Sequence, residues 1–217
     1  METGDKVILF DGTGYEYVAT LTQIDAKECL ADICEKKFSE QEPCCDVIIF
    51  QGIPKSGKME SIIQKSVELG VSKIVPVALE RCVAKLEKGK KEEEKLKRWN
   101  KVSVEAAKQC GRGRIPVVTE SVGIDEALKL MNETDLAIMP YEVLGHKGDK
   151  SLKDVLKEND FKTISILIGP EGGFTDVEAE KAKASGVKLV GLGKRILRTE
   201  TVAATMLSII MYEKNEM

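Results

Sequence analysis

The chain has 217 residues, of which 42% are apolar and 32% are charged, and its formal net charge is −3. This length is enough for one ordinary domain plus a small one, and the slightly acidic balance argues against a uniformly basic nucleic-acid binder. No apolar run approaches the roughly 20 residues of a membrane helix, and the N-terminus METGDKVILF lacks a signal-peptide pattern.

Six cysteines stand at irregular spacings without a C-x-x-C motif, which is typical of reduced thiols in the cytoplasm. The one histidine, His146, lies in the polar loop LGHKGDK. We interpret it as a solvated side chain, with a proton acceptor as the alternative. These residues predict a cytoplasmic protein without a metal site.

Two periodicities divide the chain. Residues 6–34 alternate with period two through VILF, a turn at DGTG, YEYVATL and CLADI, which predicts an antiparallel three-stranded meander. After QEPCC, strands alternate with helices, which predicts an α/β domain with a parallel sheet and helices on both faces. We place the two domains at residues 1–43 and 44–217. Three strands are marginal alone, so the first domain is expected to lean on the chain or to lack a completing part.

The elements of the second domain follow in regular order. Its predicted strands cover residues 46–50, 71–79, 115–118, 135–139, 163–168 and 187–192. Its predicted helices cover about residues 59–69, 92–110, 124–131 and 152–158, a segment opened by the capping box Thr175–Glu178, and a last segment from about Thr201. Ligands of parallel sheets bind beyond the carboxyl ends of the strands. The loops GPEGGF and GLGKRILRTET are therefore candidate ligand loops.

Positive charge is concentrated between Arg81 and Arg114, where twelve Lys/Arg stand against five Asp/Glu, while acidic residues exceed basic ones by ten elsewhere. A local basic segment suits phosphate binding. For residues 85–98 the alternative is a solvated helix whose charges pair with one another. Trp99 is interpreted as a core residue, with base stacking as the alternative.

One motif resembles a nucleotide-binding loop and fails in detail. GIPKSGKM (52–59) has the G-x-x-x-x-G-K spacing, but Met59 stands where a hydroxyl would hold magnesium, and no strand ends in the required aspartate. We interpret it as a loop before an amphipathic helix, whose lysines, including Lys58, can contact a polyanion. GLGKRI lacks the third glycine and the acidic residue of a dinucleotide site.

The two ligand loops make specific physical demands. Gly172 and Gly173 allow positive φ or close backbone approach after the stiff Pro170. Thr199 can cap the last helix, whose amide dipoles favour negative charge. A flat heteroaromatic ring would suit a pocket walled by Leu192, Ile196 and Leu197.

These residues resemble a known family. IGPEGG, followed by LGKRILRTETVAAT, is similar to the cofactor-binding segments of the RsmE family, ribosomal RNA small subunit methyltransferases of the SPOUT superfamily. The similarity continues through KMESIIQKSVELGVSKIVPV, LERC and KQCGRGRIPVV, and covers essentially residues 47–212. It implies S-adenosylmethionine as methyl donor and N3 of a uridine in 16S rRNA of the small ribosomal subunit as acceptor. It also implies a homodimer and a C-terminal trefoil knot.

The resemblance also bears on the front of the chain, where it implies a PUA-like β domain in residues 1–43. RsmE-type chains begin with an additional segment that completes this RNA-binding barrel. Met1 stands where that segment would end. We therefore expect a partial PUA-like domain with weakened RNA affinity and an intact cofactor site.

The family's site residues carry over onto three loops. The implied cofactor-binding residues are Met139, Pro140 and Tyr141 after one strand; Ile168, Gly169, Pro170, Glu171 and Gly172 at the end of the next; and Gly191, Leu192, Gly193, Ile196, Leu197 and Thr199 in the knotted segment. A carboxylate near the cationic sulfonium, Glu171 or Glu200, would help to hold it. Either can instead be an anion at a helix terminus.

Methylation at N3 requires loss of a proton and places negative charge on O2 and O4 of the base. We expect Arg198 to stabilise that charge and Glu200 to accept the proton. Arg112 and Arg114, with Lys58, are expected to contact RNA phosphates. Two alternatives stay open: a non-catalytic RNA-binding relative, and a SPOUT methyltransferase acting on transfer RNA or a ribose 2′-OH.

Overall fold

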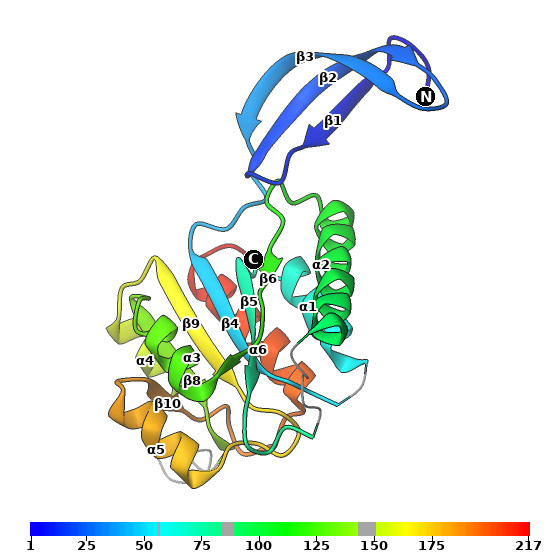
Figure 1. Ribbon diagram of the computed structural model, residues 1–217. Coiled ribbons are helices and arrows are strands. Elements are labelled where there is room, and N and C mark those ends of the chain that lie inside the picture. Colours follow the sequence, from blue (N-terminus) through cyan, green and yellow to red (C-terminus); the bar gives the residue numbers. More distant parts are fainter. Residues whose placement is uncertain (56, 84–88, 143–150) are drawn as a thin grey trace. The chain divides into compact units, whose positions relative to one another are not determined.

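The computed structural model describes residues 1–55, 57–83, 89–142 and 151–217. The chain forms two compact units (Figure 1). The first comprises Met1–Glu42 with Ala107–Ile115, and the second comprises Pro43–Ala106 with Pro116–Met217. His146 lies outside the described residues, so its two interpretations stay predictions.

The first unit contains the predicted antiparallel meander. Strands β1 (Lys6–Phe10), β2 (Tyr15–Ile24) and β3 (Cys29–Phe38) hydrogen-bond in that order. The alternating sequence buries Ala19 and Leu21. Many other large apolar side chains of this sheet stay exposed, namely Ile8, Leu9, Phe10, Leu30, Ile33 and Phe38.

The second unit is built on a parallel sheet with the strand order β10-β8-β9-β4-β5-β6, in which β7 also pairs with β5. Its strands are β4 (Asp46–Gly52), β5 (Lys73–Ala78), β6 (Val117–Val118), β7 (Val122–Gly123), β8 (Leu136–Pro140), β9 (Thr163–Ile168) and β10 (Lys188–Val190). Six of these strands were predicted in sequence. The two-residue strand β7 was not, because a segment this short has no measurable periodicity.

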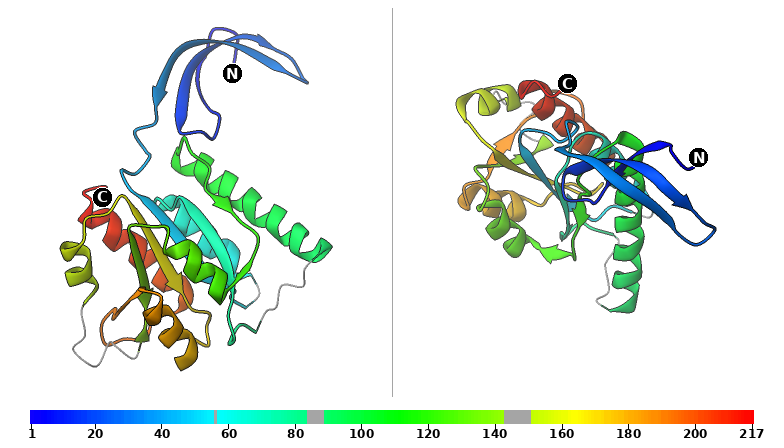
Figure 2. Two further views of the ribbon diagram at one scale, coloured as in Figure 1. Left: turned by 60° about the vertical axis from the view of Figure 1, so that its left-hand side comes forward. Right: turned by 90° about the horizontal axis from the view of Figure 1, so that it is seen from above.

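Helices cover both faces of this sheet, as the alternation of strands and helices predicted (Figures 1 and 2). They are α1 (Lys58–Glu68), α2 (Lys90–Cys110), α3 (Ile124–Met131), α4 (Leu152–Glu158), α5 (Asp176–Ala184) and α6 (Thr199–Glu213). Helices α3 and α5 pack through Leu128 and Ala179 onto the face that carries Phe50 and Leu167. Helices α1 and α6 lie together on the other face.

The helix ends follow local chemistry. The predicted capping box opens α5, where Thr175 and Glu178 exchange hydrogen bonds between side chains and backbone. Helix α6 begins at Thr199, two residues earlier than predicted, and the expected cap by Thr199 is wrong. Its N-cap is Arg198, which makes no side-chain capping bond, and the Thr199 hydroxyl donates to the Gly169 carbonyl at 2.7 Å instead.

Burial settles the position of Trp99 in favour of the core, since its side chain is almost fully covered. Among the helices in the described ranges, none combines the length and apolarity needed to cross a membrane. The six cysteines are all free thiols.

Candidate active site

A cavity of about 310 Å³ lies at the carboxyl ends of β8, β9 and β10. This volume falls at the lower end of the range of small-molecule sites. Its walls come from three loops that follow these strands, together with the first turns of α1 and α6. Thirteen of the predicted site residues line it: Lys58, Pro140, Tyr141, Ile168, Gly169, Pro170, Glu171, Leu192, Gly193, Ile196, Leu197, Arg198 and Thr199.

Four other predicted residues lie near this cavity without lining it. Met139 is fully buried within the sheet, and Gly172 packs against the side chain of Arg81. Gly191 forms an isolated bridge with Ser151. Glu200 lies in the first turn of α6. These four residues therefore lie behind or beside the residues that line the cavity.

Two glycines, one in the loop after β9 and one at the end of β4, allow the conformation and position of this loop. Gly173 has a φ of +65° and its N–H donates to the Pro170 carbonyl at 2.9 Å, which closes a tight turn. On the neighbouring strand, a Cβ at Gly52 would lie 2.8 Å from Pro170 Cδ and 2.9 Å from the Ile168 carbonyl. Only glycine at the end of β4 lets this loop approach so closely.

A buried hydrogen-bond chain joins β4, the β9 loop and α6. The Gln51 amide donates to Thr199 Oγ1 at 2.9 Å, and Thr199 Oγ1 donates to the Gly169 carbonyl at 2.7 Å. Gln51 and Thr199 are both buried. Buried polar groups of this kind hold a single geometry because an unmade bond is costly. The start of α6 is thereby held against the β9 loop.

Two carboxylates and one ammonium meet beside the cavity, whose lining includes Lys58 and Glu171 but not Glu200. Lys58 Nζ lies 3.1 Å from Glu171 Oε1 and 3.5 Å from Glu200 Oε2. The hydrogen bond that Lys58 donates to the Glu171 carboxylate raises the pKa of Lys58. Burial raises the pKa of Glu171, but bonds from its own N–H, from Lys58 and from the Lys55 N–H outweigh it, so the pKa is lowered overall.

Another part of the cavity lining is cationic and open to water. Gly193 adopts a φ of +92° and turns the chain after β10. Lys194, Arg195 and Arg198 line the cavity as exposed side chains, and within the described residues none of them has an ion-pair partner. Ile196, between these cations, is 77% exposed. Such a surface suits an anionic partner.

Polar contacts also brace the loops from outside. The Tyr141 hydroxyl donates to Asp176 Oδ1 at 3.0 Å, and burial together with this bond raises the pKa of Tyr141. Glu178, nearly buried in α5, accepts a bond from the Glu80 N–H at 2.9 Å. Arg81 donates to the Gly172 carbonyl at 3.0 Å. These bonds connect the loop after β5 to the loops of the cavity.

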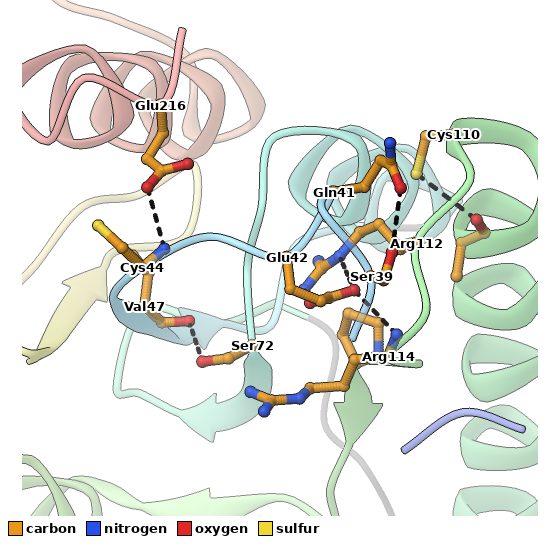
Figure 3. A network of polar contacts seen from close by, with 12 residues as sticks. Ser39, Gln41, Glu42, Cys44, Val47, Ser72, Cys110, Arg112, Arg114 and Glu216 are labelled. Atoms are coloured by element: carbon orange, nitrogen blue, oxygen red, sulfur yellow. Dashed lines mark hydrogen bonds and ion pairs between the residues drawn. The ribbon is translucent and has the colours of Figure 1, made fainter. Parts of the chain in front are cut away.

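Two predicted RNA contacts lie in the first unit. Arg112 is buried there and forms an ion pair with Glu42 at 2.8 Å, with side chains only 4% and 3% exposed (Figure 3). The backbone N–H of Arg114 donates to the same carboxylate at 2.8 Å. A guanidinium paired in this way is not free to contact phosphate, so this arrangement gives Arg112 a structural role. The partly buried Arg114 stays a predicted RNA contact.

Sequence reasoning missed several residues of the site. Gln51 and Gly52 close the apolar strand DVIIFQG, and a polar residue within such a strand was the available signal. Phe174, Glu142 and Val202 also line the cavity. Phe174 and Val202 belong to the segments GPEGGF and LGKRILRTETVAAT, but nothing in the sequence singled out these two positions or Glu142 as part of the lining.

Comparison with known proteins agrees with this architecture. A model of the RNA methyltransferase domain matches residues 40–211, and a model of the RNA methyltransferase PUA domain matches residues 1–34. A curated relative, ribosomal RNA small subunit methyltransferase E of Bacillus subtilis (strain 168), is 34% identical over 215 residues, which is 98% of this chain and 84% of the relative.

Solved structures give the same picture. Ribosomal RNA small subunit methyltransferase E from Neisseria gonorrhoeae, bound to S-adenosyl methionine, superposes with a TM-score of 0.87 at 31% identity, covering 98% of this chain and 84% of that one. A methyltransferase from Legionella pneumophila in complex with the cofactor SAM gives 0.84 at 31% identity, with the same coverage.

The fold, the cavity and the matched domains define an RNA methyltransferase that carries a PUA domain. The similarity to curated relatives narrows this class. The chain belongs to the ribosomal RNA small subunit methyltransferase E (RsmE) family.

Proposed function

We propose that the protein transfers a methyl group from S-adenosylmethionine to N3 of a uridine in 16S rRNA. The observation that carries this proposal is the cavity between the β9 and β10 loops in a member of the RsmE family. Similar structures bound to S-adenosyl methionine support the cofactor, and the names of the relatives support a ribosomal RNA of the small subunit. The choice of uridine N3 rests on the family resemblance.

The residues present fit such a cofactor. Leu192, Leu197 and Phe174 supply apolar walls for a flat ring, and Glu171 supplies negative charge. A Cβ at Gly193 would meet no atom within 4 Å, so the space beside this residue of the cavity wall is open. When bound, the cofactor would supply an electrophilic methyl group, and the loops after β8, β9 and β10 would hold it.

The chain's own chemistry then concerns the acceptor base. Arg198 at the head of α6 lines the cavity, where its guanidinium and the helix dipole can stabilise negative charge on the base oxygens. Glu200, in the first turn of the helix, is the proposed proton acceptor. Its pairing with Lys58 places it within reach of the cavity lining.

The assembly around the site is part of the same proposal. We infer a homodimer acting in the cytoplasm on the small ribosomal subunit, with residues 1–43 as a PUA-like RNA-binding domain and residues 44–217 as the SPOUT methyltransferase domain. Helix α6 supports the dimer because it leaves the large apolar side chains of Ile209 and Tyr212 exposed near its C-terminal end. Sedimentation of the full chain would show a mass of one copy if this inference is wrong.

The proposal includes a C-terminal trefoil knot. In support, the β10 loop and the start of α6 lie against the β9 loop, where Thr199 contacts Gly169 and Gln51. Threading of the C-terminal segment would require such closeness.

The test is methyl transfer to small ribosomal subunits and to naked 16S rRNA from a strain that lacks this modification. Labelled S-adenosylmethionine and mass spectrometry of nucleosides should reveal N3-methyluridine. Label on a ribose 2′-OH or on transfer RNA would instead favour another RNA methyltransferase. If calorimetry detects no binding of S-adenosylmethionine and no methyl group is transferred, a non-catalytic RNA-binding protein would be favoured.

A further inference from the structure

Lys58 connects three segments that are distant in the sequence. Its ammonium contacts Glu171 in the loop after β9 at 3.1 Å and Glu200 in α6 at 3.5 Å. The Lys55 N–H donates to both oxygens of Glu171 at 3.2 Å. The segment GIPKSGKM, whose spacing resembles a phosphate-binding loop, therefore holds a carboxylate.

The charge of this cluster follows from its contacts. Bonding to Glu171 raises the pKa of Lys58, and the bonds to Glu171 lower the pKa of that carboxyl despite its burial, so both are charged at neutral pH. One ammonium and two carboxylates leave a formal charge of −1. The side chains of Lys58, Glu171 and Glu200 are 31%, 24% and 22% exposed, so water screens this charge only in part.

Other charges on the cavity lining are more exposed. Glu142 and the cations Lys194, Arg195 and Arg198 are all exposed side chains, whose fields water and salt weaken. The Lys58–Glu171–Glu200 cluster is therefore the most shielded charge at this cavity among the described residues. A ligand charge close to this wall would respond to it first.

We propose that the Lys58–Glu171–Glu200 cluster makes the cavity prefer a nucleoside sulfonium over the neutral thioether with the same skeleton. This inference rests on the proposed function, in which the methyl donor is a sulfonium and the spent product a thioether. The cluster attracts the cation and has no comparable attraction for the product. Product therefore leaves readily, and Lys58 acts as a positioning residue that holds both carboxylates and moderates their charge.

The experiment is titration calorimetry of the full chain with S-adenosylmethionine and with S-adenosylhomocysteine. The measured quantity is the dissociation constant of the thioether divided by that of the sulfonium. Glu171→Gln removes one negative charge with little change of shape, and the ratio should fall about tenfold. Lys58→Met removes the moderating cation, and the ratio should rise by about the same factor. Lys58→Arg keeps the positive charge, so its ratio should equal that of the unmodified chain.

Lys65→Met is the matched control, because it removes the same charge from an exposed position of the same helix α1, away from the cavity lining. Its ratio should equal that of the unmodified chain. An unchanged ratio in both Glu171→Gln and Lys58→Met would overturn the inference. So would an equal loss of affinity for both ligands, since the cluster would then shape the cavity without reading charge. Binding of neither ligand by the unmodified chain would overturn the proposed function itself.

Discussion

Arg198 lines the cavity and occupies the N-cap of α6 without making a side-chain capping bond. We predict that Arg198→Ala lowers the rate of methyl transfer by about 100-fold or more, as removal of one charge-stabilising donor does elsewhere. Cofactor affinity should change little, which calorimetry can measure.

Arg195→Ala provides the comparison for this prediction, because it removes an equal charge from the same loop. We expect this variant to keep most of the transfer rate. Normal turnover in Arg198→Ala, or an equal loss in both variants, would contradict a specific role for Arg198.

The carboxyl group of Asp11 gives a prediction about stability at low pH. It accepts bonds from the Thr13 hydroxyl, the Tyr17 hydroxyl and the Thr13 N–H, which lower its pKa from 3.8 to about 2. Because the folded-state pKa is depressed, the stabilisation is present above the ordinary value and is lost as the pH falls towards 2. Carboxyl NMR titration of Thr13→Ala should show the pKa of Asp11 moving back towards 3.8, and an unmoved value would contradict this cause.

Residue types at the site could be predicted from the sequence more readily than their partners. The glycines and charges of GPEGGF and GLGKRILRTET indicated a ligand edge, and most of the inferred residues lie on one cavity. The pairing of Lys58 with Glu171 could not be predicted, because it joins segments more than a hundred positions apart. The buried ion pair of Arg112 with Glu42 could not be predicted either, because the local sequence around each residue is typical of a solvent-exposed side chain.

At the scale of elements, Gly52 sets how closely β4 and the β9 loop can approach. A Cβ there would meet backbone and ring atoms of Pro170 at 2.8 Å, and neither can move without shifting the loop. Gly52→Ala should therefore destabilise the protein by about 1 to 3 kcal/mol, as overpacking does, and weaken cofactor binding. Thermal unfolding and calorimetry would measure both effects.

Gly123→Ala is a suitable control, because an added Cβ there meets no atom within 4 Å and its φ is −79°. Its stability should change by less than about 1 kcal/mol. A Gly52→Ala variant as stable as this control would show that the loop adapts freely.

Element positions could largely be predicted from periodicity, because buried parallel strands are short apolar runs and the helices between them carry amphipathic stripes. The weak points were ends and very short pieces. Helix α6 starts two residues earlier than predicted, and Thr199 is bound to Gly169 and Gln51 rather than used as a cap. The strand order around β4 could not be predicted, since periodicity says nothing about neighbours.

On the scale of the whole molecule, the buried pair Glu42–Arg112 closes the first unit on itself (Figure 3). Arg112→Met would leave the Glu42 carboxylate buried with its charge unpaired. We predict that this change destabilises the first unit by about 3 to 5 kcal/mol, while the slope of RNA affinity against salt stays the same. Hydrogen exchange of the β2 amides and binding at several salt concentrations are the measurements.

The double change Glu42→Gln with Arg112→Met should recover much of the lost stability, because no charge is then buried alone. Arg114→Met should instead flatten the salt slope if Arg114 contacts phosphate. A flattened slope in Arg112→Met with unchanged exchange would restore the role of Arg112 as an RNA contact.

The position of β4 within its sheet has a consequence for biosynthesis. This strand hydrogen-bonds to β5, which follows soon after it, and to β9, which is translated only after α2, α3 and β8. During translation, the β9-facing edge of the apolar segment VIIF therefore stays unpaired until β9 has been synthesised. An exposed apolar strand edge of this kind promotes aggregation of nascent chains. Ribosome-bound chaperones that shelter extended apolar segments should therefore matter most for this protein during the middle of its translation.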